Sequence, residues 1–175
     1  MKIRSVLSLI IAVSISGCTT PYKPDLTGQP HANVRMVSNL HRVAWAAVLK
    51  EGCIPQTTFG WESSTQMIGV VKAKNEPKRE SIGMPLPTIP SDAAFIETTI
   101  PAGKPIALGF STIGVFHSMA CGTGLIFTPE DGADYQVTYQ HKSGFDCSID
   151  IEAIKRNEAD ILLQPIPEAT LASKC

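Results

Sequence analysis

The chain has 175 residues, of which 43% are hydrophobic and 18% are charged, and its 15 basic and 16 acidic side chains nearly balance. This balance excludes the strongly basic surface typical of nucleic-acid-binding proteins, so we expect no nucleic-acid partner. The 13 glycines and 13 prolines indicate short elements joined by turns, in a chain of suitable length for one domain with a single core.

The N-terminus has the parts of an export signal. Lys2 and Arg4 are followed by an apolar run over residues 6–15, which is far shorter than the ~20 residues that a membrane-spanning helix needs. Two small residues then precede Cys18. This order resembles the signal peptide and lipobox of bacterial lipoproteins, which implies cleavage of the signal peptide, residues 1–17, and a diacylglycerol on the Cys18 thiol. The alternative is an ordinary secretory signal before an incidental cysteine, which leaves a free periplasmic protein.

The residues after Cys18 bear on where the protein is held. In the lipoproteins that the signal resembles, an aspartate at the next position retains the protein in the inner membrane, whereas this chain has Thr19. The resemblance therefore implies lipid anchoring in the outer membrane, with the domain facing the periplasm. Several acyl chains anchor a protein stably without a membrane-spanning helix, because each methylene buried in the membrane gains about 0.8 kcal/mol. Residues 18–31 are polar with three prolines, and we expect the lipidated cysteine and a flexible tether there.

The folded domain is expected over residues 32–156 and begins with a strand. Residues 32–38 alternate in polarity, which predicts a strand with Val34 and Met36 toward the core. Residues 40–50 fit a two-residue period and also a helical stripe, and we favour the extended form.

The rest of the chain predicts short strands separated by turn residues. Residues 67–72 form one strand, whereas residues 75–90 contain four prolines and are expected to form a long loop, because proline cannot donate to a central strand. Residues 157–175 are expected to form a C-terminal tail or an edge element. Six further strands are predicted where apolar and polar residues alternate, at residues 95–100, 105–110, 114–121, 124–128, 133–141 and 145–154.

Two four-residue segments have the composition of hairpin turns. Residues 101–104 and 129–132 each combine a proline, which presets φ, with a glycine, which accepts positive φ. After the second turn, Tyr135, Val137 and Tyr139 are expected to face the core. About seven to nine strands without a convincing long helix predict an all-β fold, a two-sheet β-sandwich of the immunoglobulin-like or transthyretin-like kind.

Four cysteines remain once Cys18 carries lipid, and an even number in an exported chain predicts disulfides. Spacing alone does not decide among the three possible pairings. We favour Cys121 with Cys147, because both lie at the margins of the strands around residues 129–132, and closing a loop of this size contributes roughly 3 kcal/mol. Cys53 with Cys175 then follows by elimination, although the terminal Cys175 is also placed to stay free or to pair between molecules.

A series of short motifs runs through the predicted domain. They are Ser81-Ile82-Gly83-Met84, residues 100–105, Cys121, Phe127-Thr128-Pro129 with Gly132 and Tyr135, and Cys147. In this order, over roughly residues 33–154, they resemble a group of uncharacterised proteobacterial lipoproteins. The resemblance implies a compact β fold and brings no known activity.

No local motif predicts catalysis. Residues 109–114 lack the glycine spacing and the following helix of a nucleophile elbow, and no Cys-x-x-Cys or Cys-x-x-His spacing predicts a metal site. We therefore expect neither an enzyme nor a cofactor. Trp45 and Trp61 are candidate ligand-binding residues, because exposed indole rings can stack on sugars, but packing in the core or at the sandwich ends is the simpler interpretation.

These features predict a non-enzymatic, outer-membrane-anchored lipoprotein that acts as a protein-interaction or structural module of the cell envelope. Its recognition surface is expected at sheet edges or in the loop over residues 75–90, by strand pairing or loop insertion. One alternative is a module that binds glycan, peptidoglycan or a small ligand through Trp45 and Trp61. The other is an inhibitor that inserts a rigid loop into the active site of a lytic enzyme.

Overall fold

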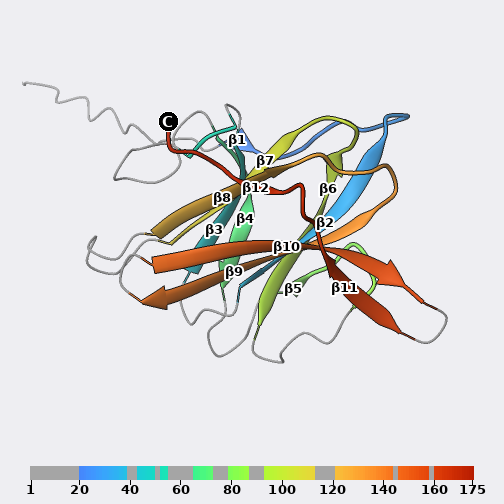
Figure 1. Cartoon of the computed structure of the whole chain (residues 1–175). Helices are drawn as coiled ribbons and strands as arrows, with labels where there is room; N and C mark the ends of the chain where they lie inside the picture. The colour runs from blue at the N-terminus through green and yellow to red at the C-terminus, as the bar shows by residue number, and fades with distance from the viewer. Residues whose placement is uncertain are drawn as a thin grey trace, which may run out of the picture.

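The structure, a computed structural model, describes residues 20–38, 43–49, 52–54, 65–72, 79–86, 93–112, 121–143, 146–157 and 160–175. All the regular elements in these ranges are β-strands, which form two six-stranded sheets (Figure 1). Sheet A contains, in spatial order, β1 (Thr20–Pro21), β4 (Thr65–Lys72), β3 (Val43–Leu49), β7 (Ile106–Thr112), β8 (Cys121–Phe127) and β12 (Thr170–Leu171). Sheet B contains β11 (Ile161–Pro165), β10 (Asp146–Arg156), β9 (Asp134–Ser143), β2 (His31–Ser38), β6 (Ala94–Pro101) and β5 (Arg79–Glu80).

The predicted two-sheet β-sandwich is confirmed, and so are most of the predicted strands. The expected strand over residues 114–121 lies outside the described residues except for Cys121, which begins β8. The ambiguous stretch at residues 40–50 is extended where it is described, in β3. Across the same ranges, no helix is long and apolar enough to span a membrane.

The core lies between the two sheets and follows the alternation of the sequence. Val34 and Met36 in β2 are fully buried, and Tyr139 in β9 is buried opposite Phe110 of sheet A, with their rings stacked at 5.2 Å between centroids. Burial raises the pKa of the Tyr139 hydroxyl above its ordinary value, and this hydroxyl donates to the carbonyl oxygen of Cys121. An aromatic pair and a hydrogen bond therefore join sheet B to the neighbourhood of β8.

The two predicted hairpin turns connect different sheets, and their prediction as hairpins was wrong. Residues 101–104 lead from β6 in sheet B to β7 in sheet A, and residues 129–132 lead from β8 in sheet A to β9 in sheet B. The local chemistry was identified correctly, since Gly103 and Gly132 have φ of 76° and 71°. A turn of this composition reverses the chain, but it does not determine whether the next strand pairs with its predecessor or packs across the core.

Part of the stretch expected as a flexible tether contacts the domain. β1 pairs in parallel with β4, Thr20 lying opposite Gln66, and Tyr22 packs against the core. Burial raises the pKa of the Tyr22 hydroxyl to about 12. The tether prediction from polar and proline residues thus missed one aromatic side chain that gains free energy by leaving water.

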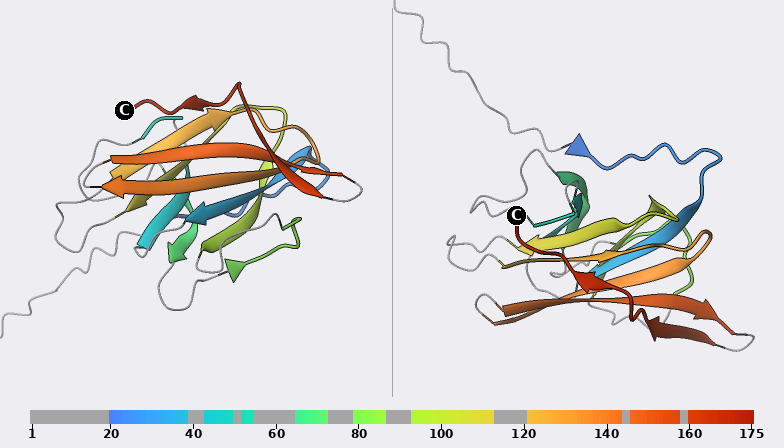
Figure 2. Two further views of the ribbon diagram at one scale, coloured as in Figure 1. Left: turned by 60° about the horizontal axis from the view of Figure 1, so that its bottom comes forward. Right: turned by 45° about the horizontal axis from the view of Figure 1, so that its top comes forward.

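The C-terminal residues, expected as a tail or edge element, provide an edge strand to each sheet. β11 pairs with the end of β10 in sheet B, and the chain then crosses to sheet A, where β12 pairs with β8 (Figure 2). Ala172 is buried beside Leu49, and the chain ends in a disulfide from Cys175 to Cys53. The sandwich therefore extends beyond the boundary at residue 156 that the sequence predicted.

Candidate functional site

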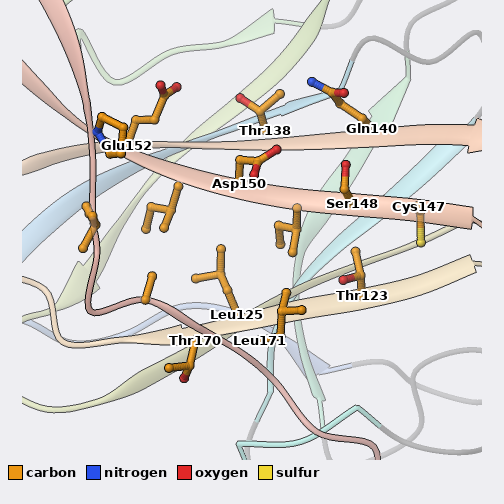
Figure 3. Close-up of a pocket in the computed structure, with 15 residues that line it drawn as sticks. Thr123, Leu125, Thr138, Gln140, Cys147, Ser148, Asp150, Glu152, Thr170 and Leu171 are labelled. Atoms are coloured by element: carbon orange, nitrogen blue, oxygen red, sulfur yellow. The ribbon is translucent and has the colours of Figure 1, made fainter.

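A groove of about 740 Å³ lies on one side of the sandwich, between β10 of sheet B and β8 of sheet A. The segment that leaves β11 and crosses to β12 borders it, as the close-up in Figure 3 shows. The groove has an apolar inner part and a polar outer part. Its inner lining comes from Leu125, Ile149, Ile151, Ile166, Ala169 and Leu171, and its polar residues are Thr123, Thr138, Gln140, Ser148, Asp150, Glu152 and Thr170.

Half of β10 has an unpaired edge at this groove. On one side β10 pairs with β9 from Asp146 to Ala153, whereas on the other side β11 pairs only with residues 152–156. β11 ends at Pro165, which lies opposite Glu152, and the chain then turns toward sheet A. No strand among the described residues pairs with the outer edge of residues 146–151. The backbone N–H and C=O groups directed to that side therefore have no strand partner in the part of the chain that the structure describes, and such groups can pair with an added strand.

The disulfide between Cys121 and Cys147 closes one end of the groove. It joins β8 to β10, with their Cα atoms 6.2 Å apart, whereas facing sheets ordinarily pack about 10 Å apart. The pairing predicted from sequence is confirmed, and so is the pairing of Cys53 with Cys175. The first bridge crosses between the sheets, however, so it holds the two walls of the groove at a fixed separation at that end.

Among the described residues that line the groove, every formal charge is negative. Asp150 and Glu152 are its ionisable side chains besides the disulfide-bonded Cys147, and no lysine, arginine or histidine is among its lining residues. Neither carboxylate forms a salt bridge to a described residue. In Figure 3 both side chains point away from Leu125, on the outer face of sheet B. A ligand that reaches this face of β10 therefore meets two carboxylates that form no ion pair with a cationic side chain of the described residues.

A second polar feature lies on the outer face of sheet B, away from the groove. Arg35 of β2 and Glu97 of β6 are directly opposite in register and form an ion pair with an Nη2 to Oε1 distance of 2.6 Å, both side chains being fully buried. The same Nη2 donates to the carbonyl oxygen of Pro85 at 2.8 Å, and the guanidinium lies 5.4 Å from the ring centroid of Phe95. This pair is buried because residues 79–86 cover it.

The other oxygen of the Glu97 carboxylate holds the covering segment. Oε2 accepts hydrogen bonds from Ser81 Oγ and Ile82 N, each at 2.7 Å, and from Met84 N at 3.2 Å. Two backbone N–H groups converge on one oxygen because Gly83 between them has a φ of 93°, which favours glycine. Burial raises the pKa of Glu97, but the hydrogen bonds from Ser81, Arg35, Ile82 and Met84 outweigh this and the pKa is lowered.

The described part of the predicted recognition loop is therefore anchored. Residues 79–86 belong to the stretch at 75–90, and the Arg35–Glu97 pair fixes their backbone to sheet B. Ser81-Ile82-Gly83-Met84 stands out as a motif in the sequence, but nothing in the local sequence indicates that these residues cover β2 and β6. The alternation that points Val34 and Met36 toward the core puts Arg35 on the opposite face of β2, and nothing in that pattern indicates its complete burial.

The remaining predicted site residues are not brought together in the described structure. Cys18 and Trp61 lie outside the described residues, and Trp45 lies in β3 opposite Val70 and Ser111. Within the described ranges, no three His, Cys, Asp or Glu side chains gather as a metal site would require. The groove residues Leu125, Asp150 and Leu171 were not predicted, because their proximity depends on the packing of separate sheets.

The chain matches no protein-family model and no curated protein sequence. The features that bear on function are the groove, the open edge of β10 and the lipobox-like pattern that ends at Cys18.

Proposed function

We propose that this protein is a lipid-anchored, non-enzymatic binding module of the outer membrane that captures an extended segment of another envelope protein. The observation that carries this proposal is the open edge of β10 at residues 146–151, next to an apolar groove. An extended peptide that pairs with such an edge gains main-chain hydrogen bonds, while its alternate side chains enter the groove. Strand addition thus uses both features at once.

The fold supports strand addition because one strand of the chain, β11, already pairs with part of the same edge of β10. β11 already pairs with residues 152–156 of β10, so this edge of sheet B accepts a strand in the structure. Pro165 ends that pairing, since proline offers no N–H to continue a ladder. The chain then leaves the sheet while the neighbouring part of the edge stays open. An incoming segment would continue sheet B beyond the end of β11.

The N-terminus supports an orientation for this module. Thr20 is already in β1, and two residues span at most about 7 Å, so a lipid on Cys18 would hold the β1 edge of sheet A next to the membrane. β8 is four strands away from β1 in that sheet, which corresponds to about 19 Å at the usual strand spacing. We propose that the groove beside β8 faces the periplasm, where a partner can reach it.

The anchor is tested separately from the binding site. Cells that express the full chain are fed labelled palmitate, and we expect the label in the wild-type protein and none in the Cys18→Ser variant. Label in neither protein, or equal label in both, contradicts the lipoprotein part of the proposal without bearing on the groove.

Binding is tested in cells with a photo-crosslinking amino acid placed at Leu171, whose side chain lines the groove and is 72% exposed. We expect a discrete product that peptide mapping assigns to one extended segment of one envelope protein. The matched control places the same group at the exposed Lys104, outside the groove. A tryptophan at the groove residue Thr123 should abolish the product, whereas Thr128→Trp, at an exposed position after β8, should not.

Three outcomes contradict the proposal. The first is equal crosslinking from Leu171 and Lys104. The second is a product that Thr123→Trp leaves unchanged although both disulfides form. The third is attachment of the Leu171 group to glycan or lipid in place of a polypeptide.

A further inference from the structure

We infer that the segment bound at β10 alternates apolar and basic side chains, an inference that rests on the proposed strand addition. A strand added to a sheet continues its two faces, because successive side chains point to opposite sides. Beside β10 those two sides are chemically different. The chemistry of each side therefore selects every second residue of the partner.

The inner side selects apolar residues. Residues opposite Cys147, Ile149 and Ile151 would share the core-facing side of sheet B, where these three side chains point. Across the groove they would meet Leu125, which is buried, and Leu171, which is largely exposed. Covering Leu171 removes apolar surface from water, which favours binding of an apolar side chain there.

The outer side selects cations. Residues opposite Ser148 and Asp150 would share the outer side, where Asp150 is exposed and Glu152 is half-buried. A basic side chain opposite Asp150 lies next to that carboxylate, and long side chains also reach diagonal neighbours such as Glu152. No cationic side chain is among the described lining residues to compete for these two carboxylates.

The geometry also sets the length of the motif. The open edge covers residues 146–151, about 20 Å of extended chain, and Pro165 and Ile166 close one end. The partner positions opposite residues 147–151 then follow the order apolar, basic, apolar, basic, apolar. A second copy of this chain does not fit, because its own β10 edge would bring Asp146 and Asp150 toward the same carboxylates.

The inference is tested with synthetic heptapeptides and the purified full-length chain in detergent. One peptide alternates valine and lysine, a second alternates valine and glutamate, and a third has the valines and lysines of the first in two separate blocks. Fluorescence anisotropy at low ionic strength measures their affinities. We expect the alternating lysine peptide to bind at least about tenfold more tightly than each of the others, because only this peptide can direct its lysines to Asp150 and Glu152 while its valines face the inner side.

Variants of the two carboxylates test the charge selection directly. We expect D150N/E152Q to reduce the preference for lysine over glutamate to within about threefold and D150K/E152K to invert it. The control E130Q/D160N removes two exposed carboxylates outside the groove lining and should keep the wild-type preference. A preference that survives D150N/E152Q unchanged overturns the inference.

Backbone modification separates this inference from the proposed function. The alternating lysine peptide is methylated on the backbone nitrogen of every valine or of every lysine, and one of these sets faces β10 in an added strand. Loss of binding by at least one methylated form, with slower amide exchange over residues 146–151, supports strand addition. If both methylated forms bind normally, strand addition is wrong. If strand addition holds but the glutamate peptide binds equally well, only the charge selection is wrong.

Discussion

The substitution Glu97→Gln should strongly destabilise the domain, because Glu97 is the buried counter-ion of Arg35. The Arg35 guanidinium is fully buried, and Glu97 is its counter-ion at 2.6 Å. Because glutamine is nearly isosteric with glutamate, the substitution removes the charge with little change in packing. Arg35 is then left buried with a full positive charge, and its Nη1 has no hydrogen-bond partner among the described residues.

The expected loss follows from these contacts. Breaking a buried ion pair by removing one partner costs roughly 3–5 kcal/mol, because the remaining charge is desolvated and uncompensated. If the oxygen of the substituted amide stays on Arg35, the amide nitrogen faces two other donors, the N–H groups of Ile82 and Met84. A loss of this size is a large part of the roughly 5–15 kcal/mol that typically stabilises a domain.

Urea denaturation at pH 7 with both disulfides intact, followed by circular dichroism, measures this loss. The control Glu152→Gln changes a half-buried carboxylate on the same face of sheet B that has no salt bridge to a described residue, so it should cost less than about 0.5 kcal/mol. The double variant R35M/E97M should lose less than Glu97→Gln, since an apolar pair leaves no buried charge. A loss below about 1 kcal/mol for Glu97→Gln refutes the reasoning.

Three further predictions concern stability. The pKa of Glu97 in the folded protein lies below its usual value of 4.5, so the ionised side chain contributes to the free energy of unfolding above that pH, and this contribution is lost as the pH falls through the folded-state pKa. Measurements of the free energy of unfolding at decreasing pH should show this loss in wild type and not in Glu97→Gln. The cysteines of Cys53–Cys175 are 122 residues apart and those of Cys121–Cys147 are 26 apart. In the chain-entropy model, C53A/C175A should therefore lose about 4.9 kcal/mol of unfolding free energy and C121A/C147A about 3.5 kcal/mol. The reverse order of stabilities in urea denaturation contradicts that model. Gly124→Ala should cost about 1–3 kcal/mol in the same assay, because its Cβ would lie 2.9 Å from the Leu108 carbonyl oxygen, whereas Gly122→Ala, with its nearest atom at 3.7 Å, should cost little.

The strands and the cysteine pairs were accessible from sequence because both depend on local regularities. Alternation placed Val34, Val137 and Tyr139 correctly in the core, since a strand exposes every second side chain to the same face. The export signal predicted an oxidising compartment, and an even cysteine count then restricted the bridges to three pairings. Strand margins were a poor reason for choosing Cys121 with Cys147, because the bridge joins two sheets and closes no hairpin.

The features that could not be predicted from the sequence are those that depend on which strands become neighbours in the fold. The turn at residues 129–132 would look the same in a hairpin and in a connection between sheets. The burial of Arg35 required a segment some 50 residues away to fold onto it, and no periodicity records that contact. The groove exists because β11 ends at Pro165, which lies opposite Glu152 near the middle of β10. Where β11 ends relative to β10 depends on the pairing register of the two strands, which the sequence of either strand alone does not indicate.

The two disulfides give the proposed binding site its rigidity. Cys53–Cys175 holds the end of the chain after β12, so the segment that borders the groove is fixed at β11 on one side and at the bridge on the other. Cys121–Cys147 fixes the separation of β8 and β10 at the opposite end. A groove held at both ends loses little conformational entropy when a peptide binds, and the ordering cost falls mainly on the extended partner. In the proposed binding mode, the acidic side chains of β10 have a second role. Their mutual repulsion disfavours pairing between the open edges of two copies of this chain, whereas a cationic segment can pair with the same edge.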